Sequence, residues 1–326
     1  MSFFWERLIK PVIVLAPMAD VTDVAFRKLI AEFGKPDVMW TEFVSADGLL
    51  RAPEEGRRKL MKALEYSESE RPVVAQFFSA DLVAMENAAR LAAALGFDGV
   101  DINMGCPDRS VERQGSGAAH IKNSSIAREI IRAAKRGAPN LPISVKTRIG
   151  YNKNELSTWL PELLSEDPAV VTIHARTRKE MSNVPARWQH VREAVEIRDN
   201  LKSRALIFGN GDVKDVPHAF ELAKEYGADG AMLGRAIFGN PWLFKNLKDR
   251  ERGIAYTPNP DERITALARH TEYFNEFLDG WKNFAIMKKH FKAYISGWDG
   301  AKNLRGELME TNSAKEALRI LQIAKR

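Results

Sequence analysis

The chain has 326 residues, of which 45% are hydrophobic and 28% charged, and its net charge is +6; this balance predicts a globular protein with one large core, or with a large domain and a small one. The longest apolar run, from Pro11 to Ala19, is too short to span a bilayer, and the first residues lack the pattern of a signal peptide, so we expect a cytoplasmic protein without membrane attachment. A single cysteine excludes an intrachain disulfide or a multi-cysteine zinc site, and the six histidines lack metal-ligand spacing, so we expect no metal.

Short runs of β-branched residues alternate with segments of helical periodicity through the first three quarters of the chain. The strand candidates are Val12–Leu15, Val38–Trp40, Val73–Phe77, Gly99–Ile102, Ile143–Lys146, Val170–Ile173, Leu206–Phe208 and Ala231–Leu233. Eight such units in this length predict an α/β fold of the (β/α)8 TIM-barrel type, and no competing α/β fold uses eight alternations as economically.

The segments between these strands have the spacing of helices with one buried face. After the first strand, we expect Thr22 to cap a helix, because the apolar residues that follow it fall at i, i+3, i+4 and i+7. These apolar residues are Phe26, Leu29, Ile30 and Phe33. Further helices are predicted at Asp81–Leu95, with Leu82, Met85, Ala89 and Ala92 facing inward, at Ser125–Lys135 and at Val213–Tyr226.

Unusual polar or glycine-containing clusters follow the strand candidates. They are Ala16-Pro17-Met18, Thr41-Glu42, Gln76, Asn103-x-Gly105-Cys106-Pro107, Lys146-x-Arg148, His174-Ala175-Arg176-Thr177, Gly209-Asn210-Gly211-Asp212 and Gly234-Arg235. In a barrel, all of them ring the mouth at the carboxyl ends of the strands, where such enzymes place their chemistry. The only cysteine, Cys106, is among them.

Glycines after the seventh and eighth strands leave backbone N–H groups open to a phosphate, and Arg235 adds a cation. Each glycine taken alone is better explained by a tight turn. No G-x-G-x-x-G motif follows a strand and no Walker loop occurs. A phosphate-bearing cofactor is therefore expected at the barrel mouth.

The pattern changes after the breaker cluster at residues 256–260, beyond which no strand is predicted. We expect a barrel domain over residues 1–248 and a small all-helical domain over 249–326, with helices at Arg263–Phe277, Phe284–Ile295 and, capped by Ser313, Ser313–Ala324. From Lys245 to Arg326 there are 16 Lys and Arg against 11 Asp and Glu, which accounts for most of the net charge. This excess indicates a surface for a polyanion; a solvated helical face that only buttresses the barrel explains the charge about as well.

An ordered set of motifs resembles the tRNA-dihydrouridine synthase family along nearly the whole chain. The motifs are Ala16-Pro17-Met18, Asp101-x-Asn103-Met104-Gly105-Cys106-Pro107, Val145-Lys146-x-Arg148, His174-x-Arg176-Thr177, Asn210-Gly211-Asp212 and Gly234-Arg235-Ala236-x-x-Gly239-Asn240-Pro241-Trp242. The resemblance implies an FMN-containing TIM barrel that reduces uridines in tRNA to 5,6-dihydrouridine, with NADPH or NADH as the electron donor.

The same resemblance implies roles for the mouth residues. Saturating the C5=C6 bond of uracil takes a hydride and a proton, and the thiol of Cys106 suits the proton donor because it is mostly protonated at neutral pH. Lys146 would stabilise the reduced flavin ring and Gln76 would hydrogen-bond to it. The remaining cofactor residues are Pro17, Met18 and Ala19 beneath the ring, and His174, Asn210, Gly211, Asp212, Gly234 and Arg235 around the phosphate tail.

The resemblance also implies that the substrate is RNA. Asn103 would pair with the uracil edge, because an amide presents both a donor and an acceptor. Contacts to the base and the RNA phosphates are expected from Arg148, Arg176 and Arg178 at the mouth, and from Lys288, Lys289 and Lys292 in the helical domain. A tRNA uridine must leave its stack to reach a barrel mouth, and RNA contacts must offset that cost. The expected partners are tRNA and NAD(P)H, with the protein a monomer.

Two other functions fit the sequence. One is an FMN barrel that reduces a free pyrimidine or another activated alkene, and the other is a tRNA-binding protein that has lost its flavin. The chain also departs from the family pattern at Lys179–Val184, where an aromatic residue is usual, and at His120, where an aliphatic residue is usual. Both departures lie in loops that bear on the substrate.

Overall fold

The computed structural model describes residues 4–247 and 255–325. Eight parallel strands form its centre in the order β1-β8-β7-β6-β5-β4-β3-β2. Their bounds are β1 Val12–Leu15, β2 Met39–Ser45, β3 Val73–Phe78, β4 Gly99–Met104, β5 Ile143–Arg148, β6 Val170–His174, β7 Leu206–Asn210 and β8 Gly230–Leu233. The seam between β1 and β2 is closed by a bridge between Val14 and Val38 and by a 2.9 Å hydrogen bond from the Asp37 N–H to the Ile13 carbonyl. The predicted TIM barrel is thus confirmed.

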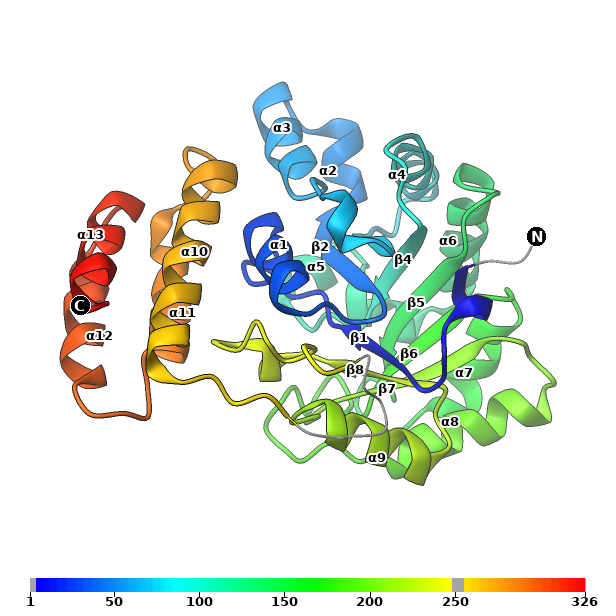
Figure 1. Cartoon of the computed structure of the whole chain (residues 1–326). Helices are drawn as coiled ribbons and strands as arrows, with labels where there is room; N and C mark the ends of the chain where they lie inside the picture. Colours follow the sequence, from blue (N-terminus) through cyan, green and yellow to red (C-terminus); the bar gives the residue numbers. More distant parts are fainter. Residues whose placement is uncertain (1–3, 248–254, 326) are drawn as a thin grey trace.

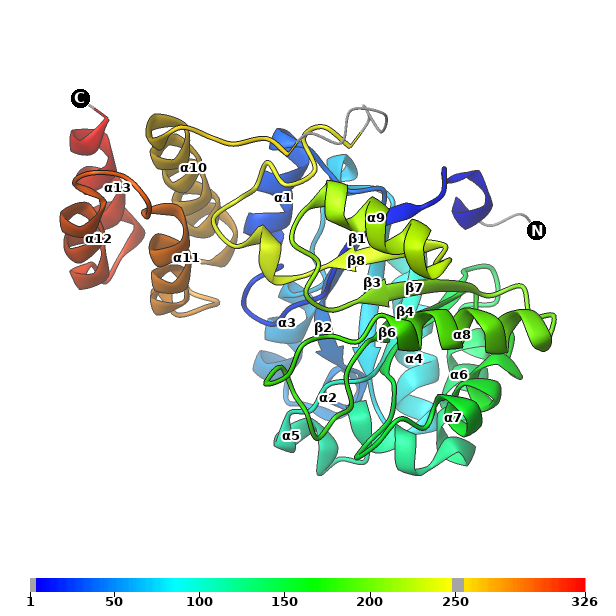
Figure 2. The same cartoon turned by 90° about the horizontal axis from the view of Figure 1, so that it is seen from below.

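Helices surround the strands in Figures 1 and 2. In the barrel they are α1 Val24–Phe33, α2 Ala46–Arg51, α3 Glu54–Lys62, α4 Leu82–Ala94, α5 Arg109–Glu112, α6 Ser124–Gly137, α7 Leu156–Leu164, α8 Gln189–Asn200 and α9 Val216–Tyr226. Short 3-10 helices are η1 Phe4–Arg7, η2 Glu68–Glu70, η3 Gly117–Lys122, η4 Arg235–Ile237 and η5 Phe284–Ile286. After the barrel come α10 Pro260–Leu278, α11 Met287–Tyr294, α12 Ala301–Glu310 and α13 Ala314–Ala324.

Side chains fill the inside of the barrel. Val12, Val14, Val74 and Phe208 belong to one buried apolar cluster that is closed at the amino ends of the strands by Trp5 of η1. The Trp5 ring lies 5.7 Å from that of Phe208, edge on. Because the interior is packed, an opening for a ligand is left to the loops at the carboxyl ends.

The start of α1 corrects one prediction. Asp23, not Thr22, caps this helix, and its carboxylate accepts a 3.1 Å hydrogen bond from the Phe26 N–H. The Thr22 hydroxyl instead accepts a 2.9 Å hydrogen bond from the Met18 N–H. Both residue types are good caps, and the Thr22 side chain is engaged by the loop that follows β1.

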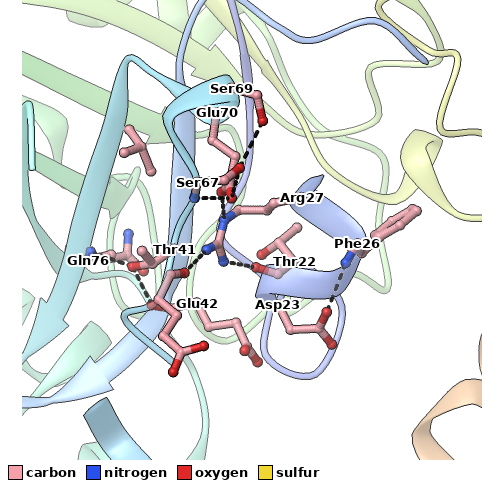
Figure 3. A network of polar contacts seen from close by, with 12 residues as sticks. Thr22, Asp23, Phe26, Arg27, Thr41, Glu42, Ser67, Ser69, Glu70 and Gln76 are labelled. Atoms are coloured by element: carbon pink, nitrogen blue, oxygen red, sulfur yellow. Dashed lines mark hydrogen bonds and ion pairs between the residues drawn. The ribbon is translucent and has the colours of Figure 1, made fainter. Parts of the chain in front are cut away.

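A buried ion pair ties α1 to η2, as Figure 3 shows. Arg27 Nε donates to Glu70 Oε2 at 2.6 Å, and both side chains are fully buried. Arg27 also donates to the carbonyls of Thr22 at 2.7 Å and Glu65 at 2.5 Å. Glu70 accepts a further 2.8 Å hydrogen bond from the Ser67 N–H. The pair therefore has the additional partners that a buried charge requires.

The helices α10–α13 form a separate bundle at one side of the barrel, next to α1 (Figures 1 and 2). Ser313 caps α13, as predicted, whereas α12 is an additional helix that the sequence did not reveal. The expected domain boundary, between residues 248 and 249, lies outside the described residues. No helix of the described part is long and apolar enough to cross a bilayer.

An aromatic layer joins this bundle to the barrel. The Phe26 ring of α1 stacks on His270 of α10 at 4.7 Å and meets His290 of α11 edge on at 5.0 Å. Gly239 lies in the same interface with a positive φ of 66°, and a Cβ there would come within 2.4 Å of the Ala293 backbone. Close approach to α11 therefore requires glycine at position 239.

The buried histidines of this layer predict acid-sensitive stability. Burial lowers the pKa of His270 to about 3, whereas in the unfolded chain it is about 6.5. The contribution of neutral His270 to the free energy of unfolding is therefore fully present above pH 6.5. It is lost as the pH drops toward 3, by up to about 1.4 kcal/mol per pH unit. His270→Phe should flatten this slope in urea unfolding measured at several pH values, while His218→Gln on α9 should not. Parallel pH profiles for His270→Phe and the parent protein would contradict the assignment. Part of the slope will persist, because burial also lowers the pKa of His290.

Candidate functional site

A cavity of about 830 Å³ opens at the carboxyl ends of the strands. It is lined by Ala16, Pro17, Met18, Phe43, Asn103, Gly105, Cys106, Pro107, Lys146, Arg148, His174, Arg176, Ser182, Asn210, Gly211, Asp212, Val213, Lys214, Met232, Gly234, Arg235 and Ala236. This volume lies within the range of roughly 300–1,000 Å³ that is usual for small-molecule and cofactor sites. Most of the residues expected at the mouth therefore share one cavity.

Cys106 stands in the loop between β4 and α5, residues 105–108, which we name the cysteine loop, at the wall of this cavity. Its N–H donates to Asn103 Oδ1 at 2.9 Å, and its carbonyl accepts from the Ala118 N–H at 2.9 Å. Burial raises the pKa of the thiol above its ordinary value. At neutral pH the group is therefore a protonated thiol held at a fixed place, which suits a proton donor and not a nucleophile.

Asn103 is partly committed to the protein. Its amide oxygen accepts from the N–H groups of Gly105 at 3.1 Å and Cys106 at 2.9 Å, and its Nδ2 donates to Gln76 Oε1 at 3.0 Å. One amide hydrogen is left for a ligand. The prediction that both a donor and an acceptor of Asn103 meet the uracil is thus reduced to a donor alone, because the oxygen shapes the cysteine loop.

Gln76 lies behind Asn103 and does not line the cavity. It is fully buried, and its Nε2 donates to Asp101 Oδ2 at 2.5 Å. Asp101 also accepts from Ser144 Oγ at 2.5 Å, and burial raises its pKa to about 6. No role was expected for Asp101, although a carboxylate within an apolar strand signals a buried polar contact. A direct contact of Gln76 with a flavin stays a prediction.

Lys146 projects from β5 into the cavity. Burial, together with repulsion from Arg148, lowers its pKa to about 8. The amine is thus still mostly charged near neutral pH, in a place where burial strengthens its interaction with any anionic group.

Arg148 connects the loop after β4 to the loop after β6. Its Nε donates to the Gly105 carbonyl at 2.8 Å, and its Nη1 donates to the carbonyls of Thr177 at 3.1 Å and Met181 at 3.0 Å. Met181 belongs to the segment 179–184 that departs from the family pattern. The side chain faces the cavity but holds the cysteine loop to the loop after β6, a contact that the sequence did not predict.

A chain of four polar side chains crosses the far side of the cavity. Arg235 donates to Asp212 at 2.7 Å, Arg176 Nη2 donates to the same carboxylate, and Arg176 Nη1 lies 3.1 Å from His174 Nε2. Arginine only donates, so His174 Nε2 must accept and its proton must sit on Nδ1. Burial and nearby arginines lower the pKa of His174 well below its usual value, which keeps the ring neutral.

The apolar, amide and glycine residues predicted for the cofactor site differ in whether they line the cavity and in what they contact. Pro17 and Met18 line the cavity, whereas Ala19 is exposed and lies outside the lining. Asn210 Nδ2 donates to the Met232 carbonyl at 2.8 Å and so ties β7 to β8. At Gly211, which has a φ of 122°, a Cβ would come within 2.8 Å of Ala186 and 3.1 Å of His174, so the close packing of these side chains requires glycine there.

The remaining predicted substrate residues are not together. Arg178 pairs with Glu112 and lies outside the cavity. Lys288 and Lys289 are half-buried on α11, and Lys292 is exposed there. Phe43 and Met232, which sequence analysis missed, line the cavity; as apolar residues on apolar strands they give no distinguishing signal.

Comparison with known proteins assigns the chain to a family. A model of the dihydrouridine synthase family matches residues 14–326. The chain is 38% identical over 320 residues to a probable tRNA-dihydrouridine synthase of Staphylococcus aureus (strain COL), which covers 98% of this chain and 94% of the relative. It is also 38% identical to probable tRNA-dihydrouridine synthase 2 of Bacillus subtilis (strain 168), with 98% and 95% covered.

Solved structures share the fold at much lower identity. Morphinone reductase in complex with tetrahydroNAD aligns with a TM-score of 0.50 at 13% identity, over 78% of this chain and 91% of that chain. Histamine dehydrogenase from Rhizobium sp. 4-9 aligns with a TM-score of 0.53 at 12% identity, over 96% and 62%. These two support the barrel alone, whereas the match across nearly all of the chain decides the family. The protein is a member of the dihydrouridine synthase family.

Proposed function

We propose that this protein reduces the C5=C6 bond of uridines in tRNA to 5,6-dihydrouridine. The names of its relatives in Staphylococcus and Bacillus point to this substrate. The observation that carries the proposal for this chain is the protonated thiol of Cys106 at the wall of a cavity that also holds Lys146. Saturating the double bond needs one hydride and one proton, and the thiol would give the proton to one of the two carbons.

The cavity fits FMN. Pro17 and Met18 offer an apolar surface for a flat ring, and Lys146 offers a charge-assisted hydrogen bond. The exposed guanidinium of Arg235 offers a cation to a phosphate. FMN bound here and reduced by NADPH or NADH would supply the hydride.

Asp212 serves a different purpose from the direct cofactor contact expected at first. A carboxylate repels a phosphate, and this one is held ionised: burial alone would raise its pKa, but hydrogen bonds from Arg176 and the Ala186 N–H lower it overall. Asp212 therefore positions Arg176 and Arg235, while Arg235 makes the contact.

The proposed reaction is tested with purified protein, FMN, NADPH and an unmodified tRNA transcript. We expect a gain of two hydrogens at a uridine, read by mass spectrometry of the digested tRNA. Free uracil, uridine and an activated alkene serve as competing substrates, and turnover of these without RNA would favour a small-molecule reductase. A protein that stays colourless with FMN but binds tRNA would favour the non-catalytic alternative. Mapping dihydrouridine in cells that lack the protein then identifies the position.

Removing the cation inside the cavity should weaken flavin binding. A charge-assisted hydrogen bond contributes about 1.5–3 kcal/mol, so Lys146→Ala should raise the Kd for FMN roughly 10- to 100-fold. Flavin fluorescence quenching measures this without any turnover. Lys224→Ala, an exposed lysine on α9, is the matched control. A Lys146→Ala protein that retains FMN as tightly as the control would remove Lys146 from the cofactor site.

A further inference from the structure

The three arginines first expected to contact RNA at the mouth are engaged within the protein. Arg148 donates to three carbonyls. Arg176 is 2% exposed and pairs with Asp212, and Arg178 pairs with Glu112. Cations that hold loops in this way have few donors left for a polyanion, so the grip on RNA phosphates must come from other residues.

Arg178 also joins three loops into one surface beside Cys106. Its ion pair with Glu112 fastens α5 to the loop after β6, and its Nη2 lies 3.4 Å from the Pro107 carbonyl. The Arg178 and Lys179 N–H groups donate to the carbonyls of Gly150 and Tyr151, in the loop after β5, at 2.9 and 2.8 Å. Figure 2 shows the loop after β6 reaching α5. The surface is therefore continuous with the cysteine loop.

Five exposed cations stand on this surface, and we name them the basic rim: Arg109, Arg113, Lys122, Lys153 and Lys179. Within residues 4–247 and 255–325, none of the five forms an ion pair. Arg109 and Arg113 line a hollow of about 420 Å³ together with Glu112. Lys122 lies 4.3 Å from the centre of the Tyr151 ring.

The carboxylates around the basic rim are already engaged. Glu112 pairs with Arg178, Glu155 accepts a 2.6 Å hydrogen bond from the Tyr151 N–H, and Glu180 pairs with Arg187 at 2.7 Å. Asp108 caps α5, accepts from Ser110 and interacts electrostatically with Arg113. Arg113 Nε also donates to the Arg109 carbonyl at 3.2 Å. The rim cations form no ion pair among the described residues, so they keep donors for an external polyanion.

The helical bundle has fewer cations available for RNA than its net charge suggests. Lys282 pairs with Glu42 at 2.8 Å and with Asp20 at 3.0 Å, both in the barrel. Lys289 is half-buried and interacts electrostatically with the same carboxylates. Part of the positive charge of the C-terminal quarter thus attaches the bundle to the barrel.

We propose that the basic rim binds the backbone phosphates on either side of the uridine that enters the cavity, so that the barrel itself, more than α11, grips the RNA. This inference rests on the proposed function. A nucleotide drawn out of its stack remains covalently linked to its neighbours, so its flanking phosphates must lie beside the opening. Contacts there offset the cost of unstacking, about a few kcal/mol, at the point where that cost arises.

The test compares two triple variants of equal charge in the FMN-loaded protein. The rim variant is Arg109→Gln, Arg113→Gln, Lys179→Gln. The control variant is Arg7→Gln, Lys202→Gln, Arg204→Gln, three exposed cations at the opposite, amino end of the barrel. The Kd for an unmodified tRNA transcript is measured by fluorescence anisotropy between about 50 and 200 mM salt, where each phosphate contact contributes close to one unit to the slope of log K against log salt.

We expect the slope of the rim variant to fall by about 2 to 3 units, and that of the control variant to stay at the parent value. Equal slopes for the two variants would overturn the inference. So would a larger fall in a third variant, Lys288→Gln, Lys292→Gln, Lys302→Gln, because the main grip would then lie on the bundle. Dihydrouridine formation by the parent protein is measured on the same transcript: its absence defeats the proposed function, whereas its presence with an unchanged rim slope defeats the rim alone.

Discussion

Replacing Cys106 with alanine should reduce dihydrouridine formation by about 10²–10⁴-fold, the usual contribution of a positioned general acid. Neither binding of the cofactor nor electron transfer from NADPH is expected to need the thiol, so flavin content and NADPH oxidation should stay near the parent values. Single-turnover reduction of tRNA by protein loaded with reduced cofactor isolates the affected step.

The pH dependence supplies an independent check on Cys106. Because burial raises the pKa of its thiol, the acid form persists through neutral pH, and the rate should decline only as the pH rises through that elevated value. This component of the alkaline decline should be absent in Cys106→Ala and displaced in Cys106→Ser, whose hydroxyl is a far weaker acid. A decline from the deprotonation of Lys146, whose pKa is about 8, should remain in all three proteins. Near-normal turnover by Cys106→Ala across the pH range would mean that another group delivers the proton.

Breaking the buried ion pair between Arg27 and Glu70 should lower the free energy of unfolding more than any other substitution that we propose. Arg27→Met leaves the Glu70 carboxylate without a counterion in a fully buried place (Figure 3), and such changes cost about 3–5 kcal/mol. Urea unfolding of the FMN-loaded protein measures the loss. We expect the double variant Arg27→Met, Glu70→Gln to recover part of it, because the unpaired charge is then gone.

An exposed pair provides the comparison for Arg27. Lys59 and Glu55 on α3 lie 2.8 Å apart with side chains that are 56% and 83% exposed, and exposed pairs of this kind contribute little to stability. Lys59→Met should therefore leave the free energy of unfolding nearly unchanged. A loss in Arg27→Met no larger than that in Lys59→Met would show that water or another group compensates Glu70.

The barrel could be predicted because the strands are short apolar runs, most of them with β-branched residues, but the end of the second strand was misjudged most, for a physical reason. The second strand continues to Ser45, past Thr41 and Glu42, which were read as a polar cluster after its end. Glu42 is 6% exposed within the strand, and Lys282, from the far end of the chain, compensates its charge at 2.8 Å. Local patterns hold no information about such a distant partner.

How well a helix could be predicted depended on how much apolar surface it buries. Strongly periodic α4 and α6 were predicted nearly to their ends, whereas α12 escaped because only Ala301 and Leu308 of its residues are buried. A helix that buries so little has almost no apolar face to detect. It begins after Gly300, which has a positive φ of 80°, a conformation that glycine adopts without strain.

At the site, the sequence identified many of the residues that share the cavity, but not their contacts within the protein. Arg148 was expected to touch RNA, yet its partners include the carbonyls of Gly105 and Thr177. Every residue carries such a carbonyl, so no side-chain pattern marks the ones that face an arginine. The charge of Lys146 and the thiol of Cys106 were easier to interpret, because the residue type itself indicates a cation and an acid.

The carboxylate of Asp212 has more donors than it needs. It accepts from Arg235 at 2.7 Å, from the Ala186 N–H at 2.9 Å and from Arg176. The Arg176 side chain is 2% exposed, whereas that of Arg235 is 65% exposed. Arg235 can therefore leave Asp212 for an incoming anion without stranding an unpaired charge, since two donors remain. Capture and release of an anionic group at this mouth thus need the swing of one surface side chain and no opening of the barrel.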